Sequence, residues 1–300
     1  MTENSKESLI ENWYQVLLQK GKSDHTLQAY RRGITHFMQW YEQVYKADFD
    51  VKLVMPRDVR NWKSQQQSVE KMAPATINLR LVAVSRFFSW AVHENLCREN
   101  PTEEVGTIRL ETRNAKGLKS NQLRRLLRAA KEDLRDYAIL ELMAGTGLRV
   151  GELLALQIGD LKLGERSGSV IVRQGKQGNY REIPLTSDVR KAVADYLRNE
   201  HPDPKNAQAP LWSGRKGYMS QRSSINRMLE KYGQVAKIPP PGPHVLRHTF
   251  ATRYLAANPD DLRGLARLLG HANLNTVMIY TEPDMDSLTN RMERVETLAE

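Results

Sequence analysis

Several basic, imidazole and phenolic side chains occur in short phrases that could act on a phosphate ester. The first phrase is Ala144-Gly-Thr-Gly-Leu-Arg149-Val-Gly-Glu152. Its two glycines indicate a turn directly before a helix, where free backbone N–H groups and the Arg149 guanidinium would converge on one phosphate. Arg149 and Glu152 are three residues apart, so a simple ion pair within the helix is the alternative. The phrase is neither a Walker loop nor a dinucleotide-binding motif, because it lacks Gly-Lys-Ser/Thr and no strand precedes it.

A second phrase, His244-Val-Leu-Arg247-His248, places an imidazole three residues before a guanidinium. At this spacing His244 and Arg247 share one helix face, which offers a proton-transfer group beside a cation. His244 and His248 are four residues apart, as in some zinc sites. However, no glutamate stands between them, and Arg247 would repel the ion. We therefore predict that these residues hold no metal.

The third phrase is Leu268-Leu-Gly-His271-Ala-Asn-Leu-Asn-Thr-Val-Met-Ile-Tyr280. Gly270 is expected to end one helix as its C-cap residue, with Tyr280 two turns into the next helix. Taken singly, such a tyrosine is more often a packed aromatic residue than a nucleophile. Its pairing with His271 in the preceding turn keeps the nucleophile open as a second interpretation.

Length and charge limit what the chain can be. Its 300 residues suggest one large or two ordinary domains. The formal net charge of +10 favours a polyanionic partner such as nucleic acid, with an anionic membrane surface as the alternative. No stretch approaches the roughly 18 apolar residues of a membrane span, and the amino terminus is polar, so we expect a cytoplasmic protein. The single cysteine, Cys97, excludes an intramolecular disulfide framework and a thiolate-rich zinc site.

The spacing of apolar residues divides the chain into two parts. In the first hundred residues they recur at intervals of three and four, which predicts three or four packed helices and no strand. After Pro101 the chain has few large apolar residues and no period, as is typical of an interdomain linker. We therefore predict an N-terminal helical domain at 1–105, a basic linker at 106–116 and a second domain at 117–300.

The second domain changes period once. The runs 169–174 and 180–185 alternate and are rich in β-branched residues, and a turn-forming run from Gly175 to Asn179 joins them. This pattern predicts a β-hairpin with Lys176 at its tip. The other periodic segments are helical, so the fold class is mainly α with a small β-hairpin or sheet. The expected helices cover 134–144, 150–157, 188–199, 221–234, 245–257 and 262–269.

A basic segment begins at the linker. From Arg113 to Lys131 the chain holds seven basic residues and no acidic one. We expect this segment to contact DNA phosphates, although a solvated charged face is an equal alternative for any one residue. The candidate DNA-binding residues are Arg113, Lys116, Lys119, Arg124 and Arg125.

Together these phrases carry a family resemblance over nearly the whole chain. The chain resembles the tyrosine recombinases, also called the phage integrase family, of the Xer-like type. The first half, in 25–41 and 76–101, is similar to that family's SAM-like helical core-binding domain, and the second half to its catalytic domain. The matching catalytic positions, in the family's order, are Arg149, Lys176, His244, Arg247, His271 and Tyr280.

The resemblance implies a role for each of these positions. Tyr280 corresponds to the nucleophile that attacks a DNA phosphodiester, leaving a 3′-phosphotyrosyl link and a free 5′-hydroxyl. Arg149 and Arg247 match the pair that stabilises the charge on the phosphate, and Lys176 matches the general acid for the leaving 5′ oxygen. His244 and His271 match the two histidines that assist proton transfer and hydrogen-bond the phosphate, and the sequence does not say which does which. Glu152 matches a supporting residue that orients the others.

The resemblance also implies an assembly and a cellular place. The segment 286–298 has apolar residues at Leu288, Met292, Val295 and Leu298, which predicts an amphipathic helix. In this family the terminal helix docks on a neighbouring protomer, giving a tetramer on paired double-stranded DNA sites with this protein or a related recombinase. The alternative is that the helix packs on its own domain. We expect a cytoplasmic, nucleoid-associated protein. Its reaction is expected to pass through a Holliday junction and to need no metal or cofactor.

Two other functions remain open at this point. A non-catalytic DNA-binding architectural or regulatory protein of the same fold would bind DNA without chemistry, although it would have no reason to retain all six catalytic positions. A topoisomerase with the same chemistry would relax supercoils without a partner site. The sequence alone does not specify the DNA target.

Overall fold

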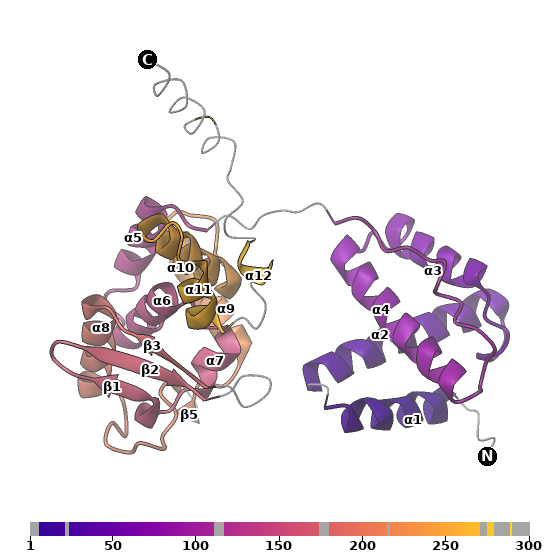
Figure 1. Ribbon diagram of the computed structural model, residues 1–300, viewed down its shortest axis with the longest axis horizontal. Helices are drawn as coiled ribbons and strands as arrows, with labels where there is room; N and C mark the ends of the chain where they lie inside the picture. Colours follow the sequence, from indigo (N-terminus) through magenta and orange to yellow (C-terminus); the bar gives the residue numbers. More distant parts are fainter. Residues whose placement is uncertain are drawn as a thin grey trace. The chain divides into compact units, whose positions relative to one another are not determined.

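The computed structural model describes residues 6–21, 24–110, 117–173, 180–214, 217–270, 275–278 and 289 (Figure 1). Residues 1–112 and 113–300 form two separate units, each with its own hydrophobic core. Most described residues lie in helices, and the strands form two small antiparallel sheets. The predicted fold class is therefore confirmed. None of the described helices is long and apolar enough to cross a membrane.

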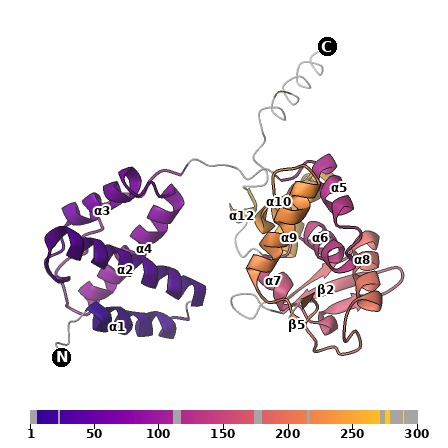
Figure 2. The same ribbon diagram turned by 180° about the vertical axis from the view of Figure 1, so that it is seen from behind.

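The first unit is built from four helices around an aromatic core. Its helices are α1 (Lys6–Gln19), α2 (Asp24–Tyr45), α3 (Pro56–Ser68) and α4 (Pro74–His93). Helix α2 packs chiefly against α4, with α1 against α2 and α3 against α4 (Figures 1 and 2). Phe37 is fully buried and makes edge contacts with Trp62 and Phe88. Because losing a buried aromatic side chain costs about 3–5 kcal/mol, this cluster fixes how the helices cross.

The chain that follows α4 stays attached to the first unit. The Asn78 amide donates to the Ile108 carbonyl oxygen and its own oxygen accepts from the Ile108 N–H, both at 2.8 Å. Val105 and Ile108 also pack against the first core. Residues up to Ile108 are therefore held on α4.

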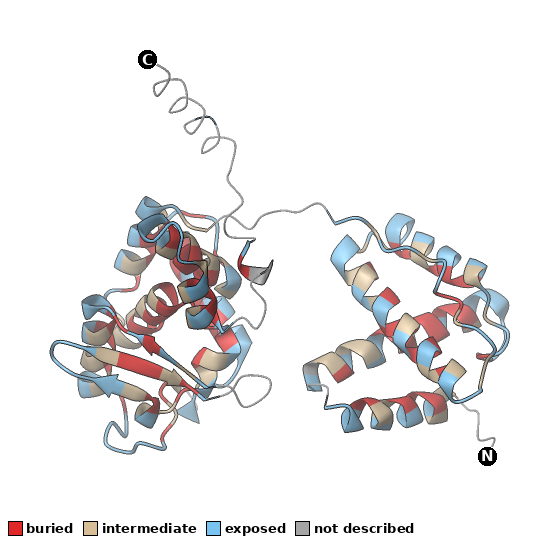
Figure 3. Ribbon diagram, in the orientation of Figure 1, coloured by how far each residue is buried: buried red, intermediate tan, exposed pale blue. Residues whose placement is uncertain are grey.

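The second unit, from residue 113, surrounds a larger core with helices and a three-stranded sheet (Figure 3). The elements of the second unit are α5 (Ser120–Ala129), α6 (Leu134–Thr146), α7 (Val150–Ala155), the 3₁₀ helix η1 (Ile158–Asp160), β1 (Leu161–Leu163), β2 (Gly168–Val172), β3 (Arg181–Pro184), α8 (Ser187–Asn199), β4 (Ser213–Gly214), β5 (Gly217–Tyr218), α9 (Arg222–Val235), α10 (Pro243–Ala257), α11 (Leu262–Leu269) and α12 (Asn275–Met278). Helix α6 packs against both α8 and α10.

The predicted hairpin is present as β2 and β3, which pair antiparallel with Val172 opposite Arg181. Alternation along these strands places Val170 and Ile183 in the core. Strand β1 and the β4–β5 pair were not predicted from the sequence. Each has only two or three residues, which is too short for a readable alternation.

A partly buried polar network links α2, α3 and α4 in the first unit. The indole N–H of Trp62 donates to Nδ1 of His36 at 3.0 Å, and Nε2 of His36 lies 3.1 Å from Arg80 and 3.3 Å from Glu70. Burial and the Arg80 charge lower the pKa of His36, although Glu70 opposes them. The Trp62 hydrogen bond requires Nδ1 without a proton, so the neutral imidazole is the form that fits.

We predict that the first unit loses stability in mild acid through His36. Because folding lowers the pKa of His36, the unfolded chain takes up the proton more readily. The contribution of neutral His36 to the free energy of unfolding is complete above its ordinary pKa of 6.5. It is lost as pH falls through the lower pKa of the folded state. Urea unfolding followed by tryptophan fluorescence, between about pH 7.5 and about pH 5, measures the loss. Four of the five tryptophans lie in the first hundred residues.

The His36→Asn variant provides the comparison. Its amide oxygen takes the position of Nδ1 and can accept from Trp62 but does not titrate, so the variant should lose less stability than wild type over this interval. Equal losses in the two proteins would contradict the assignment.

Candidate active site

Arg149 occupies a tight junction between two helices. Helix α6 ends at Gly147, whose φ of +64° is left-handed, and α7 begins at Val150. A side chain on Gly147 would meet Phe250 and Leu269 at 2.5 and 2.9 Å. Glycine is required here on both counts. The predicted glycine turn before a helix is thus present, with Arg149 as the N-cap residue of α7.

Glu152 holds Arg149 from within the first turn of α7. Its Oε2 accepts from the Arg149 backbone N–H at 2.8 Å, and its Oε1 accepts from Nη1 of the same residue at 3.0 Å. The Glu152 side chain is 8% exposed, whereas that of Arg149 is 43% exposed. The carboxylate thus anchors one edge of a guanidinium that otherwise reaches solvent.

Arg247, on α10, lies beside Arg149 in the fold. It is 5% exposed, and its Nη1 donates to the Gly147 carbonyl at 2.7 Å, while Nη2 donates to the Leu269 carbonyl at 2.8 Å. Nη1 of Arg149 lies 3.4 Å from the same Leu269 oxygen. Two guanidiniums that are 98 residues apart in the sequence therefore converge on one acceptor.

Electrostatics explains how two cations remain together. Leu269 is the last residue of α11, and the carboxyl end of a helix carries partial negative charge on its unpaired carbonyls. Glu152 adds a full negative charge on the Arg149 side. Two guanidiniums held in this way suit an anion with several oxygens, such as a phosphate.

The predicted histidine on α10 is exposed. His244 lies one turn before Arg247, near the start of the helix, as its spacing predicted. His248, on the following turn, is half-buried, and burial lowers its pKa. Among the described residues, no group of three His, Cys, Asp or Glu side chains is placed to hold a metal ion.

Five predicted residues lie outside the described part of the chain: Arg113, Lys116, Lys176, His271 and Tyr280. In the sequence, Lys176 falls between the end of β2 and the start of β3, and Gly270 directly precedes His271. Met278, two residues before Tyr280, is the last residue of α12.

The remaining basic candidates lie at and near the start of α5. Lys119, Arg124 and Arg125 are all exposed. Arg125 also donates to the Lys237 carbonyl at 2.8 Å, which ties α5 to the chain after α9. This residue therefore has a structural contact in addition to any contact with DNA.

Sequence reasoning missed Arg181, the first residue of β3. Its side chain is 11% exposed, and it donates through Nη1 and Nη2 to the two Glu152 oxygens at 3.0 and 2.8 Å. Its Nε donates to the Leu268 carbonyl at 2.8 Å. A signal was available, because alternation places Arg181 on the same face as buried Ile183, where an arginine needs a partner.

Glu152 is ionised in this setting. Burial raises the pKa of Glu152, but hydrogen bonds from Arg181 and the Arg149 backbone, together with both arginine charges, outweigh burial and lower it overall. The Arg149, Glu152 and Arg181 side chains therefore carry two positive charges and one negative charge.

Comparison with known proteins identifies the family. The profile described as "Phage integrase family" matches residues 116–287, and "Phage integrase, N-terminal SAM-like domain" matches 10–95. Tyrosine recombinase XerC of Thermodesulfovibrio yellowstonii is 34% identical over 286 residues, covering 91% of this chain and 90% of the relative. The chain belongs to the phage integrase family of tyrosine recombinases. The resemblance seen in the sequence is confirmed, and the protein is a tyrosine-type site-specific recombinase.

Two further relatives are consistent with this membership. Tyrosine recombinase XerD of Ralstonia nicotianae is 35% identical over 272 residues, covering 88% of this recombinase and 85% of the relative. The fold matches the crystal structure of XerH site-specific recombinase bound to difH substrate, with a TM-score of 0.70 and 22% identity. That match covers 91% of this recombinase and 79% of the XerH chain.

We predict that the Gly270→Ala substitution disturbs the arginine cluster. Gly270 has a φ of +65°, and a Cβ there would lie 2.7 Å from Nη1 of Arg181. The left-handed backbone alone should cost about 1–2 kcal/mol of unfolding free energy. Urea unfolding followed by circular dichroism measures this loss.

Gly151→Ala is the matched control for this substitution. Gly151 lies inside α7, where a Cβ would meet only Arg222, at an ordinary 3.5 Å. That substitution should be neutral or stabilising, since alanine favours a helix. If both variants unfold at the same urea concentration as wild type, the prediction that Gly270→Ala lowers the free energy of unfolding is wrong.

Proposed function

We propose that this recombinase cleaves and rejoins duplex DNA through a covalent 3′-phosphotyrosyl intermediate at Tyr280. The observation that carries the proposal is the convergence of Arg149 and Arg247 on the Leu269 carbonyl oxygen. A phosphate beside these two side chains would receive hydrogen bonds from guanidiniums that the fold already holds in place. Such preorganised donors are the main means of stabilising charge that develops during phosphoryl transfer.

In the proposed cleavage step, the Tyr280 oxygen attacks the phosphorus as its proton leaves toward His244 or His271, and the bond between phosphorus and the 5′ oxygen breaks. Lys176 gives a proton to that oxygen, which departs as a 5′-hydroxyl. The energy of the broken ester is retained in the phosphotyrosyl bond, so rejoining needs no nucleotide.

Rejoining reverses this step with a different strand. A 5′-hydroxyl from the partner site gives its proton to Lys176 as its oxygen attacks the phosphotyrosyl phosphorus, and the Tyr280 oxygen leaves and recovers a proton from His244 or His271. Exchange of one strand pair gives a Holliday junction, and exchange of the second pair resolves it. The charge that a metal ion would otherwise supply comes in this proposal from Arg149 and Arg247.

DNA binding is assigned to both units, the helical domain and the catalytic domain joined by the basic linker. In the second unit we assign phosphate contacts to Lys119, Arg124 and Arg125 and, from the sequence, to Arg113 and Lys116. Affinity that comes from phosphate contacts falls steeply with salt. A protein acting on circular or mobile DNA is expected to be nucleoid-associated in the cytoplasm.

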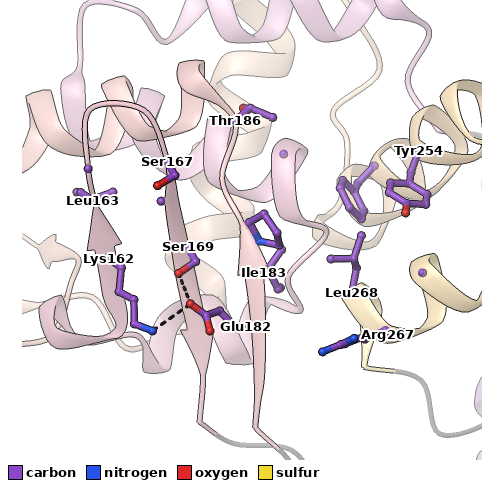
Figure 4. Close-up of a pocket in the computed structure, with 16 residues that line it drawn as sticks. Lys162, Leu163, Ser167, Ser169, Glu182, Ile183, Thr186, Tyr254, Arg267 and Leu268 are labelled. Carbon is purple, nitrogen blue, oxygen red and sulfur yellow. Dashed lines mark hydrogen bonds and ion pairs between the residues drawn. The ribbon is translucent and has the colours of Figure 1, made fainter.

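We further propose that the active assembly is a tetramer on paired sites, joined through the segment 286–298. A pocket of 1110 Å³ between the three-stranded sheet and helices α10 and α11 supports this proposal. Figure 4 shows Ile183 on the sheet side of this pocket, with Tyr254 and Leu268 on the helices opposite. An apolar cleft of this kind suits the apolar positions Leu288 and Met292 of a second copy.

We predict a covalent protein–DNA adduct for wild type and none for Tyr280→Phe. The assay incubates each protein with nicked duplexes in EDTA, using DNA that flanks the gene and a random-sequence pool, and separates the products on a denaturing gel. A nick lets the short 5′ fragment diffuse away and traps the adduct. Sequencing the trapped DNA gives the site.

The adduct assay and a plasmid relaxation assay together separate the alternatives. Binding without an adduct on any substrate, including the random-sequence pool, would contradict the proposed chemistry and favour a non-catalytic DNA-binding protein. Relaxation of a supercoiled plasmid that carries a single site would instead indicate a topoisomerase.

We predict that Leu163→Glu impairs assembly on paired sites. Leu163 lines the pocket and is 36% exposed, so a carboxylate there would oppose an apolar segment. Native gels with DNA should show single-site binding within about threefold of wild type but at least a tenfold loss of paired-site complexes, the effect of about 1.4 kcal/mol. Deleting residues 286–300 should have the same effect.

Val235→Glu is the control for this experiment. Val235 ends α9, is 61% exposed and does not line the pocket. It should assemble like wild type. Normal paired-site complexes with Leu163→Glu would place the docking site elsewhere.

A further inference from the structure

We propose that Arg181 is a positioning residue for the recombination reaction, which holds Glu152 so that Arg149 remains aligned and available for the phosphate. This inference rests on the proposed function of Arg149. Arg181 lies in the strand pattern 180–185 but in none of the three phrases that hold the candidate catalytic residues.

The contacts of Arg181 reach two other elements from β3. Both terminal nitrogens engage the two Glu152 oxygens on α7, in parallel bonds of 3.0 and 2.8 Å, while Nε bonds the Leu268 carbonyl at the end of α11. A two-bond arginine–carboxylate pair fixes direction as well as distance. Arg149 meets Glu152 through only one of its side-chain nitrogens, Nη1.

The charges explain why a second arginine is needed. If Glu152 faced Arg149 alone, one carboxylate would neutralise one guanidinium, and Arg149 would attract a phosphate weakly. Arg181 is 11% exposed and supplies a second cation to the same carboxylate. The Arg149–Glu152–Arg181 group therefore keeps a net charge of +1, on the side where Arg149 is 43% exposed.

Arg181 also lies against the turn that leads to His271. The guanidinium lies so close to Gly270 that a Cβ there would come within 2.7 Å of Nη1. Arg181 is also the first residue of β3 and is paired with Val172, the last residue of β2. One side chain on β3 thus links the first turn of α7 to the end of α11.

The kinetic test uses Arg181→Gln and Arg181→Lys in the full-length protein. Single-turnover adduct formation on a nicked duplex at saturating protein gives the chemical rate, and fluorescence anisotropy gives the DNA dissociation constant. Arg181→Gln should lower the rate about 100-fold, the effect expected from misplacing a catalytic group by about 1 Å. The dissociation constant should change less than about threefold, because phosphate contacts elsewhere supply most of the affinity. Arg181→Lys keeps the charge but not the two-bond pair, so its chemical rate should lie between those of wild type and Arg181→Gln.

Arg190→Gln is the matched control. Arg190, on α8, donates to the Leu185 and Glu165 carbonyls and packs on Gly168 in the same sheet, but it contacts no carboxylate of the site. It should keep the wild-type chemical rate within about threefold, since it lies outside the arginine cluster. A rate loss equal to that of Arg181→Gln would reduce Arg181 to a general support of the sheet.

The pH profile provides a readout that a purely structural role would not change. Arg149 on α7 and Arg181 on β3 lower the pKa of Glu152, and Arg222 on α9 reaches the neighbouring Gly151. Without Arg181, burial still raises the pKa of Glu152 and Arg149 alone opposes it, so this pKa should be higher than in wild type. The rate of Arg181→Gln relative to wild type should therefore rise with pH, and the Glu152→Gln/Arg181→Gln double variant should lose this dependence. A pH-independent ratio would overturn the proposal.

A second measurement does not require activity. The ¹³C carboxyl resonance of Glu152, assigned by its absence in Glu152→Gln, should titrate at higher pH in Arg181→Lys than in wild type, because the two-bond pair is lost. Identical titration in the two proteins would overturn the proposal even if no substrate were cleaved. Failure of wild type to form any adduct would count against the proposed function alone.

Discussion

The carboxyl end of α11 is the point on which the arrangement of the site depends. The carbonyl of Leu268 accepts from Arg181, and that of Leu269 accepts from Arg247 and, at 3.4 Å, from Arg149. A helix end must find donors for its last carbonyls, and here three guanidiniums supply them. The same bonds that complete the helix also bring side chains from α7, β3 and α10 together.

This arrangement explains why two glycines are indispensable to the geometry. Gly147 and Gly270 both have left-handed φ angles and end α6 and α11. The backbone must turn sharply at each point, and the space of a side chain is already taken by Phe250 and Leu269 at one and by Arg181 at the other. The glycines therefore permit the close approach of helix ends to the arginines.

The sequence predicted the local features of this site and missed the connections between them. The glycine turn before Arg149, the hairpin that flanks Lys176 and the C-cap at Gly270 each rest on a few adjacent residues, so their patterns are readable. The hydrogen bonds of Arg247 to Gly147 and Leu269 join positions up to 100 residues apart, and no local period specifies them. Arg181 was missed for the same reason, since the carboxylate that explains it is 29 residues away.

The two units have separate cores, and every hydrogen bond among Arg149, Glu152, Arg181, Arg247 and the end of α11 lies within the second. A substitution among the helices of the first unit therefore removes none of the donors or acceptors of the arginine cluster. The sequence of the first unit can change while every side chain that holds Arg149 and Arg247 in place is kept.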